Sequence, residues 1–430
     1  MQRQFKIFAD PVHGFVMVPK GLVLELVQHP VVQRLRRIRQ LGVGHLVFPG
    51  AEHTRFGHAL GAMALMHEAL LHLREKGVTI NEEEFEAGLI VALLHDVGHA
   101  PFSHTLESVF MEDFQHEYMS RALMDDLNRA FGGRLELALG MFDGIYPRPF
   151  FQELISSQLD VDRLDYLRRD SFYTGVSEGK VGVGRILKTL TVFPSGSYHG
   201  RLAVEEKGIY AVENFLIARK LMYWQVYLHK TVLAGDHVLH ALFLHARKQA
   251  KRDPSSALPP ETSPTLRYFL EHTLTLQDIQ RPDVRKQFCM LDDSDILFSL
   301  KHWAAHPDPV LADLARRFIN RQLFRVVFLN EPPSAEIRAR WQEQVSDWLL
   351  REGLSTPSSL PEILPYYLHI HSTSHHAYEP DNGPIYILQR DGQLQELTTT
   401  RYGRLLKPLG ALITRTYVCY PKEVPLAIPG

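Results

Sequence analysis

The sequence contains very little cysteine: Cys289 and Cys419 are the two thiols in a chain of 430 residues. So low a count excludes a disulfide framework and a cysteine-rich zinc site, and it is typical of a reducing compartment. The chain also has little net charge, a formal value of −2 at pH 7. Electrostatics therefore give no reason to expect broad binding to nucleic acid or to a membrane surface.

Long hydrophobic runs are missing as well. No uncharged apolar stretch approaches the roughly 18 residues that a bilayer-spanning helix needs. The first residues, Met1–Ile7, lack the apolar core of a signal peptide. We therefore expect a cytoplasmic protein without membrane association.

The overall composition is that of a globular protein. The hydrophobic share is 45% and the charged share 22%, and the length allows two domains or one large domain with an appendage. Apolar residues recur at helical spacing to about residue 320, and strand-like alternation follows. We predict a mainly α protein with a helical core over residues 1–320 and a small α+β domain over residues 321–430. The segments expected to be helices include 82–96, 116–130, 150–170 and 208–248, and the expected strands include 366–371, 384–388 and 393–397.

The densest group of ionisable residues lies in residues 94–104, directly after the apolar run 88–94. Three histidines and an aspartate fall within this stretch. If the buried helix continues through it, His95 and His99 lie one turn apart on the same face, and Pro101 ends the helix. Such a face predicts metal ligands or proton carriers at the C-terminal end of a core helix.

Two other segments, residues 53–61 and residues 159–170, look helical yet carry more ionisable groups than a core helix tolerates without partners. One economical explanation is that all three segments converge on a cation. Two imidazoles and two carboxylates form a mixed nitrogen and oxygen site that suits Mn²⁺, Fe²⁺, Ni²⁺, Zn²⁺ or Mg²⁺, and ligand type alone does not choose among these ions. The four candidate ligands are His58, His95, Asp96 and Asp162.

The order of these residues is a histidine, then a His-Asp pair in an apolar helix, then an aspartate in a third helix. This order resembles the HD-domain metal-dependent phosphohydrolases. Further motifs resemble the deoxynucleoside triphosphate triphosphohydrolases, the group that includes the vertebrate sterile-alpha-motif-and-HD enzyme and its bacterial relatives, of which the bacterial kind is expected to be the closer match. The motifs cover roughly residues 5–250 and include Gln40-Leu41-Gly42, His53-Thr54-Arg55-Phe56-Gly57-His58, His95-Asp96-Val97-Gly98-His99, His116-Glu117 and Asp160-Val161-Asp162-Arg163.

The resemblance implies a role for each motif. The four candidate ligands would hold the metal, and a second set would contact the phosphates and move protons: His99, His104, His116 and Glu117. In that set His104 is the preferred proton donor to the departing O5′, with His116 as the alternative and Glu117 orienting His116. A third set would bind substrate through arginines on the polyphosphate, polar groups on the 3′-hydroxyl, a leucine that crowds the 2′ position and tyrosines beside the sugar and base. These substrate-binding residues are Gln40, Leu41, Arg55, Arg163, Tyr166, Asp170, Arg219 and Tyr227.

The implied reaction is metal-dependent hydrolysis of a dNTP to a deoxynucleoside and intact triphosphate by a homo-oligomer, expected to be a tetramer. An activating nucleotide is expected between subunits, at Lys6, Gln28, Gln33 and Arg36. Two alternatives stay open: an HD-type phosphatase or phosphodiesterase acting on another nucleotide, and a non-catalytic nucleotide sensor. The C-terminal histidines are expected to be strand and loop residues rather than a metal cluster; they are His369, His371, His375 and His376.

Overall fold

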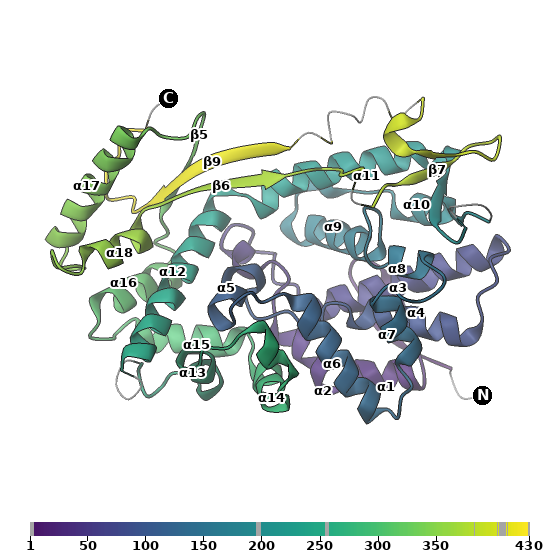
Figure 1. The fold of residues 1–430 in the computed structure, drawn as a ribbon, viewed down its shortest axis with the longest axis horizontal. Coiled ribbons are helices and arrows are strands. Elements are labelled where there is room, and N and C mark those ends of the chain that lie inside the picture. Colours follow the sequence, from purple (N-terminus) through teal and green to yellow (C-terminus); the bar gives the residue numbers. More distant parts are fainter. Residues whose placement is uncertain are drawn as a thin grey trace.

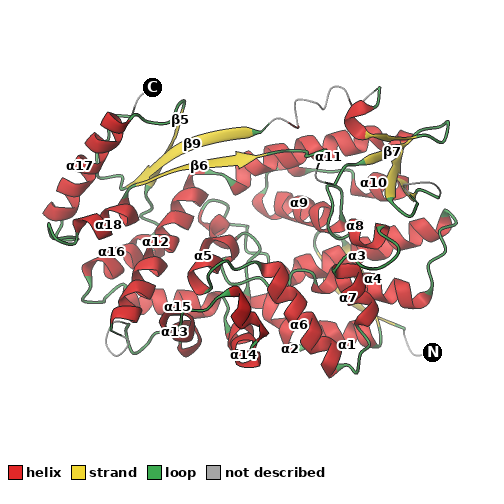
Figure 2. Ribbon diagram, viewed as in Figure 1, coloured by secondary structure: helices red, strands yellow, loops and turns green. Residues whose placement is uncertain are grey.

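The computed structural model describes residues 4–194, 199–253, 258–381, 383–401, 403, 410 and 412–428, and the side chain of His104 lies outside this description. Helices dominate, and the strands form an N-terminal hairpin and small sheets (Figure 2). The prediction of a mainly α fold with a C-terminal α+β part is confirmed. None of the helices in the described residues combines the length and the apolar character needed to cross a bilayer.

The helices within residues 1–320 are α1 (Leu22–Gln28), α2 (Pro30–Arg34), α3 (Arg55–Glu75), α4 (Glu82–Leu94), α5 (Ser103–Phe110), α6 (His116–Ala130), α7 (Glu136–Phe142), α8 (Phe150–Glu153), α9 (Val161–Thr174), α10 (Val183–Thr189), α11 (Ile209–Met222), α12 (Lys230–Arg252), α13 (Pro264–Glu271), α14 (Pro282–Met290), α15 (Asp293–Trp303) and α16 (Pro309–Ile319). The later helices are α17 (Ala335–Arg351) and α18 (Leu360–Tyr367). The strands are β1 (Phe5–Asp10), β2 (Gly14–Pro19), β3 (Leu190–Val192), β4 (Leu202–Glu205), β5 (Arg325–Leu329), β6 (His369–His375), β7 (Tyr386–Leu388), β8 (Leu394–Glu396) and β9 (Ile413–Tyr420).

The centre of the helical part is the long helix α3, which packs against α4 and α9. A capping box begins α4: the Asn81 side chain accepts a hydrogen bond from the backbone N–H of Glu84 at 2.8 Å, and the Glu84 carboxylate accepts one from the N–H of Asn81 at 2.9 Å. From Ala87 to Leu94 the helix is apolar and buried on every side. The polar residues that follow Leu94 therefore enter the interior of the molecule.

The segments predicted as single helices over residues 150–170 and 208–248 are each interrupted. The first divides into α8 and α9, because the Asp160 carboxylate caps α9 by accepting a hydrogen bond from the backbone N–H of Arg163 at 2.7 Å. The second divides into α11, a π-helical turn at Tyr223–Tyr227, and α12. Such π-turns are frequent at functional sites, and this one adjoins the residues expected to bind substrate.

The C-terminal strands enter two sheets. One has the order β5-β9-β6 with antiparallel neighbours. The other has the order β3-β4-β7-β8, in which β4 pairs parallel with β7. Strands from either side of residue 320 thus share a sheet, and the domain boundary placed there stays a prediction.

Strands β6 and β9 lie side by side along one edge of the molecule; β6 runs from the region of α18 toward α11, and β9 runs in the opposite direction (Figure 1). The strand predicted over residues 366–371 is corrected at its start, because Tyr366 and Tyr367 end the helix α18 and the strand begins at His369. Its far end, His375, therefore lies next to the helical part.

Candidate active site

Four side chains from three segments meet at the C-terminal end of α4. His58 comes from α3, Asp162 from the first turn of α9, and His95 and Asp96 follow α4 directly. Oδ1 of Asp162 lies 3.1 Å from Nε2 of His58 and 3.6 Å from Nε2 of His95. Nε2 of His58 is also 3.7 Å from Oδ2 of Asp96. The structure thus brings together all four residues that the sequence suggests as metal ligands.

The protonation of this group suits a bound cation. Nδ1 of His58 bonds the Asp165 carboxylate at 2.8 Å and Nδ1 of His95 bonds the Ala92 carbonyl at 2.8 Å, so both rings direct Nε2 inward. Both Nε2 atoms are buried, and in the described residues carboxylate oxygens of Asp96 and Asp162 lie 3.1 to 3.7 Å from them. Burial alone lowers the pKa of His58, but the charges and hydrogen bonds of Asp162 and Asp165 outweigh it and raise the pKa to about 10. These residues fit a divalent metal ion, which would take the place of that proton.

The helix that carries His95 ends earlier than the sequence suggests. α4 stops at Leu94, and the residues up to Pro101 form turns, so His95 and His99 do not share a helix face. A close backbone approach explains the difference: a Cβ atom on Gly98 would lie 2.2 Å from the carbonyl oxygen of His116. The stop therefore comes from tertiary packing against α6.

A buried arginine stabilises this turn by hydrogen bonds to its backbone. Arg34 donates to the carbonyl oxygen of His99 at 3.0 Å and to that of Leu291 at 2.9 Å, and its guanidinium lies 4.5 Å from the centre of the Phe288 ring. Burial lowers the pKa of Arg34 to about 10, so the side chain stays charged at neutral pH. The turn that carries His95 and Asp96 is thus held by a fixed cation.

A second group of possible ligand atoms adjoins the first. Asp96, His99 and His116 each offer an atom within 4.8 Å of the others. The rings of His99 and His116 stack with centroids 3.7 Å apart. Nδ1 of His99 bonds Glu107 at 3.0 Å, and Nδ1 of His116 lies 3.4 Å from Glu117. Burial and the charge of His99 lower the pKa of His116 to about 3, so this imidazole is neutral at pH 7.

Several residues that orient the ligands were missed at the level of sequence. The Asp165 carboxylate contacts Nδ1 of His58 at 2.8 Å, Nε2 of His13 at 2.5 Å and Nε of Arg169 at 2.9 Å. Arg169 also bonds Asp10 at 2.8 Å, which ties α9 to the N-terminal hairpin. The available signal was the i, i+4 spacing of Asp165 and Arg169, which places them on one face of the helix. These groups fix the ring of His58 and its tautomer.

The predicted sugar-binding residues line a cavity of about 570 Å³ beside the ligand group. Oε1 of Gln40 is buried and without a partner among the described residues. Asp170 is held by the Tyr227 hydroxyl at 2.6 Å and by Nε2 of His53 at 2.7 Å. Arg55 joins the cavity to the ligand group, since its Nη1 donates to Asp96 at 2.7 Å. The predicted residues on the wall of the cavity are Gln40, Leu41, Arg55, Tyr166, Asp170 and Tyr227.

The two remaining predicted arginines lie next to Tyr166 but do not line this cavity. Nε of Arg163 donates to the Ser157 carbonyl at 2.7 Å, and Arg219 donates to Oε1 of Gln158 at 3.1 Å. Burial opposes the charge of Arg163, but Asp160 outweighs it and raises the pKa of Arg163. Both side chains are therefore cations at neutral pH.

The residues suggested for an activating nucleotide lie near the N-terminus, away from the cavity lining. Nε of Arg36 donates to Oε1 of Gln33 at 2.9 Å, and its guanidinium lies 3.6 Å from the centre of the Phe56 ring. Lys6 is exposed on β1 and Gln28 is exposed at the end of α1. Gln33 and Arg36 are thus paired with each other, and in the described part of the chain no hydrogen bond or ion pair joins them to Lys6 or Gln28.

The fold and the histidine and aspartate group define an HD-domain phosphohydrolase. Residues 55–170 match the HD domain and residues 181–253 match the HD associated region. The chain belongs to the HD-domain phosphohydrolases, which are metal-dependent hydrolases, and the match to this family confirms the resemblance drawn from the motifs.

Individual relatives extend the similarity over the chain. The YwfO protein of Bacillus subtilis is 35% identical over 436 residues, which cover 97% of this chain and 93% of YwfO. A phosphohydrolase structure from Bacteroides thetaiotaomicron is 41% identical with a TM-score of 0.88, over 97% of this chain and 99% of that chain. The deoxynucleoside triphosphate triphosphohydrolase SAMHD1 of Xenopus laevis is 28% identical over 273 residues, 52% of this chain and 43% of SAMHD1.

Proposed function

We propose that the protein hydrolyses deoxynucleoside triphosphates to the deoxynucleoside and inorganic triphosphate. The observation that carries the proposal is the cavity of about 570 Å³ that joins the candidate ligand group through Arg55 and presents the unpartnered Oε1 of Gln40. A buried acceptor without a partner costs free energy unless a ligand or water donates to it. A sugar hydroxyl supplies that donor. The similarity to SAMHD1, whose name states this reaction, supports the same substrate class.

In this proposal His58, His95, Asp96 and Asp162 hold the divalent ion. When bound, the ion supplies Lewis acidity, which polarises a phosphoryl oxygen and lowers the pKa of a bound water. Arg163 and Arg219 neutralise the polyphosphate, and Asp170 and Gln40 fix the 3′-hydroxyl. These contacts hold the α-phosphorus in one orientation relative to the ligand group.

The bond changes balance without a further reactant. A water oxygen adds to the α-phosphorus and the water gives up a proton, the bond between that phosphorus and O5′ breaks, and O5′ takes up a proton as triphosphate separates. We assign the proton donor to His104, with His116 as the alternative and His99 on the phosphates. The lowered pKa of His116 favours His104, because a donor must hold its proton at neutral pH.

Selectivity for the deoxy sugar is expected to depend on Leu41, which lines the cavity beside Gln40. We predict that Leu41→Ala lowers the ratio of kcat/KM for dATP over ATP by about tenfold or more, because it opens space for a 2′-hydroxyl. Steady-state kinetics with both nucleotides measure the ratio. Leu71→Ala, which truncates a leucine 40% exposed on α3, is the matched control and leaves the ratio unchanged. A ratio unchanged in Leu41→Ala would remove this residue from sugar selection.

The substrate proposal is tested by a panel of the four dNTPs against Mn²⁺, Fe²⁺, Ni²⁺, Zn²⁺ and Mg²⁺, with and without a second nucleotide. We further propose that the enzyme is a homotetramer activated by a nucleotide at Lys6, Gln28, Gln33 and Arg36. A second nucleotide is expected to stimulate the wild-type enzyme but not the Arg36→Ala variant, and this difference would support the regulation. If the enzyme hydrolyses none of the four dNTPs under any of these conditions, the proposed function is wrong.

A second candidate function is hydrolysis of another nucleotide, as a phosphatase or phosphodiesterase with two ions. The specific observation in its favour is the second group, Asp96, His99 and His116, whose ligand atoms lie within 4.8 Å of one another. Paired ions are a common arrangement for phosphate ester hydrolysis. Two ions per chain together with a preference for nucleoside monophosphates or cyclic dinucleotides favour this candidate over the first.

A further inference from the structure

We infer that His375, at the end of β6, binds the terminal phosphate of the substrate, so that the C-terminal part of the chain completes the triphosphate site. The inference rests on the proposed function, because it places a triphosphate between the candidate metal ligands and β6. The helical part alone would then hold the metal and the sugar but would leave the far end of the polyphosphate without one of its partners.

The first observation is the position of the His375 ring. It stacks on Tyr223 with centroids 3.4 Å apart and 8° between the ring planes. Tyr223 begins the π-helical turn and lines the cavity beside the ligand group. β6 reaches this turn because it runs along the edge of the molecule toward α11 (Figure 1). The ring is therefore fixed at the border of the substrate site.

The second observation is an unused polar atom. Nε2 of His375 is buried and has no hydrogen-bond partner within the described residues. A buried ring nitrogen without a partner costs free energy in the unliganded protein. A phosphate oxygen that reached Nε2 would accept a hydrogen bond from it and remove this cost.

The third observation is the positive charge around the ring. Arg219 donates to the carbonyl oxygen of Ala377 at 3.5 Å and to Oε1 of Gln158 at 3.1 Å, both neutral acceptors. Burial and the charges of Arg219, His376 and Arg163 lower the pKa of His375 to about 4. The imidazole is thus neutral at pH 7. Arg163 already faces a carboxylate, since its Nε lies 3.3 Å from Oδ2 of Asp160, whereas Arg219 has the neutral acceptors. An anion beside the ring is attracted by Arg219 and accepts from the ring N–H.

The charged groups also have an order that matches a phosphate chain. Arg163 directly follows the candidate ligand Asp162 in α9, and Arg219 donates to the carbonyl oxygen of Ala377, two residues beyond His375. A polyphosphate that begins at the metal ligands and follows these side chains ends at His375. The α-phosphate therefore lies at the metal, and the terminal phosphate lies at β6.

The experiment measures the binding of inorganic triphosphate and of inorganic pyrophosphate to the metal-loaded, full-length protein by calorimetry. We expect His375→Asn to weaken triphosphate binding by about tenfold or more, because a hydrogen bond to a charged group is lost. Pyrophosphate binding is expected to stay within about twofold, since the shorter chain does not reach β6. The KM for a dNTP rises by a similar factor while kcat changes little.

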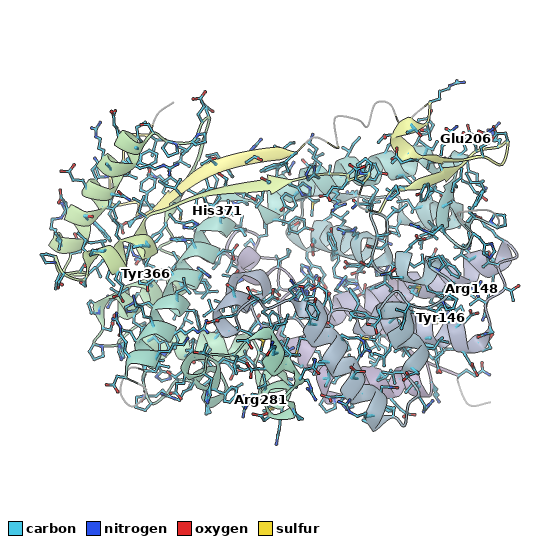
Figure 3. The ribbon with its side chains drawn as sticks, viewed as in Figure 1. Tyr146, Arg148, Glu206, Arg281, Tyr366 and His371 are labelled. Atoms are coloured by element: carbon cyan, nitrogen blue, oxygen red, sulfur yellow. The ribbon has the colours of Figure 1, made fainter. Side chains whose placement is uncertain are left out.

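Two further variants separate binding from folding. His375→Gln places its side-chain N–H about as far from the backbone as Nε2 of histidine, which the shorter asparagine does not, and is expected to recover most of the triphosphate affinity. His371→Asn changes an exposed histidine four positions earlier on the same strand and is expected to bind both anions like the wild type (Figure 3). A loss in His375→Asn that His375→Gln restores supports a direct contact.

The outcomes also distinguish this inference from the proposed function. If dNTPs are cleaved to triphosphate but His375→Asn binds triphosphate as the wild type does, the inference is wrong and the function stands. If the wild type binds triphosphate through His375 but cleaves no dNTP, the proposed function is wrong and the anion contact stands. Equal loss of triphosphate and pyrophosphate binding in His375→Asn overturns the assignment to the terminal phosphate.

Discussion

Replacement of Asp162 by alanine is expected to remove the bound metal and the hydrolase activity together. This carboxylate lies 3.1 Å from Nε2 of His58 and 3.6 Å from Nε2 of His95, so it is the anion that both imidazoles face. Burial opposes its charge, but the two histidines outweigh it and lower the pKa of Asp162. We expect kcat/KM to fall about a thousandfold or more, with metal content near zero.

Elemental analysis of the purified variant and a hydrolysis assay at saturating metal measure both effects. Asp283→Ala, which truncates an exposed aspartate at the start of α14, is the matched control and keeps wild-type metal content and rate. Thermal unfolding of Asp162→Ala is expected to show a folded protein. Unchanged metal content in this variant would remove Asp162 from the metal site.

Gly61→Ala is expected to have a large effect for a single added methyl group. A Cβ atom on Gly61 would lie 1.9 Å from Oδ1 of Asp165 and 2.4 Å from Nη2 of Arg169. Both side chains are buried and paired with each other, and Asp165 also fixes the ring of His58. The added atom must displace this ion pair, so we expect a loss of about 3 kcal/mol or more in the free energy of unfolding and weaker metal binding.

Urea denaturation and metal titration measure the two consequences of Gly61→Ala. Gly140→Ala is the matched control, because Gly140 lies in the helix α7 and a Cβ atom there meets no heavy atom within 4 Å. Alanine has the higher helix propensity, so this control is expected to raise stability by up to about 1 kcal/mol. Wild-type stability and metal affinity in Gly61→Ala would show that α3 and α9 are not packed as described.

The sequence was informative where chemistry is concentrated in short motifs. His58, the His95-Asp96 pair and Asp162 could be singled out because ionisable residues are rare in apolar helices without partners, and the structure places them within a few ångströms of one another. The strand and helix pattern also predicted a mainly α fold with a C-terminal α+β part. In each case the signal is local in the chain.

The features that could not be predicted depend on contacts between distant segments. α4 stops at Leu94 because the backbone at Gly98 approaches that of His116. Asp165 on α9 pairs with His13 in the turn of the N-terminal hairpin, 152 positions earlier in the chain. His375 reaches Tyr223 only because β6 pairs with β9 along the edge of the molecule. Hydrophobic periodicity contains no information about these contacts.

The central claim is that water attacks the α-phosphorus and that O5′ leaves. The most direct test incubates the metal-loaded enzyme with a dNTP in water enriched in heavy oxygen and analyses the products by phosphorus NMR and mass spectrometry. Attack of water at the α-phosphorus gives a deoxynucleoside without label and inorganic triphosphate that carries one heavy oxygen on a terminal phosphorus. Formation of a deoxynucleoside monophosphate with pyrophosphate, or of orthophosphate with a diphosphate, would contradict it.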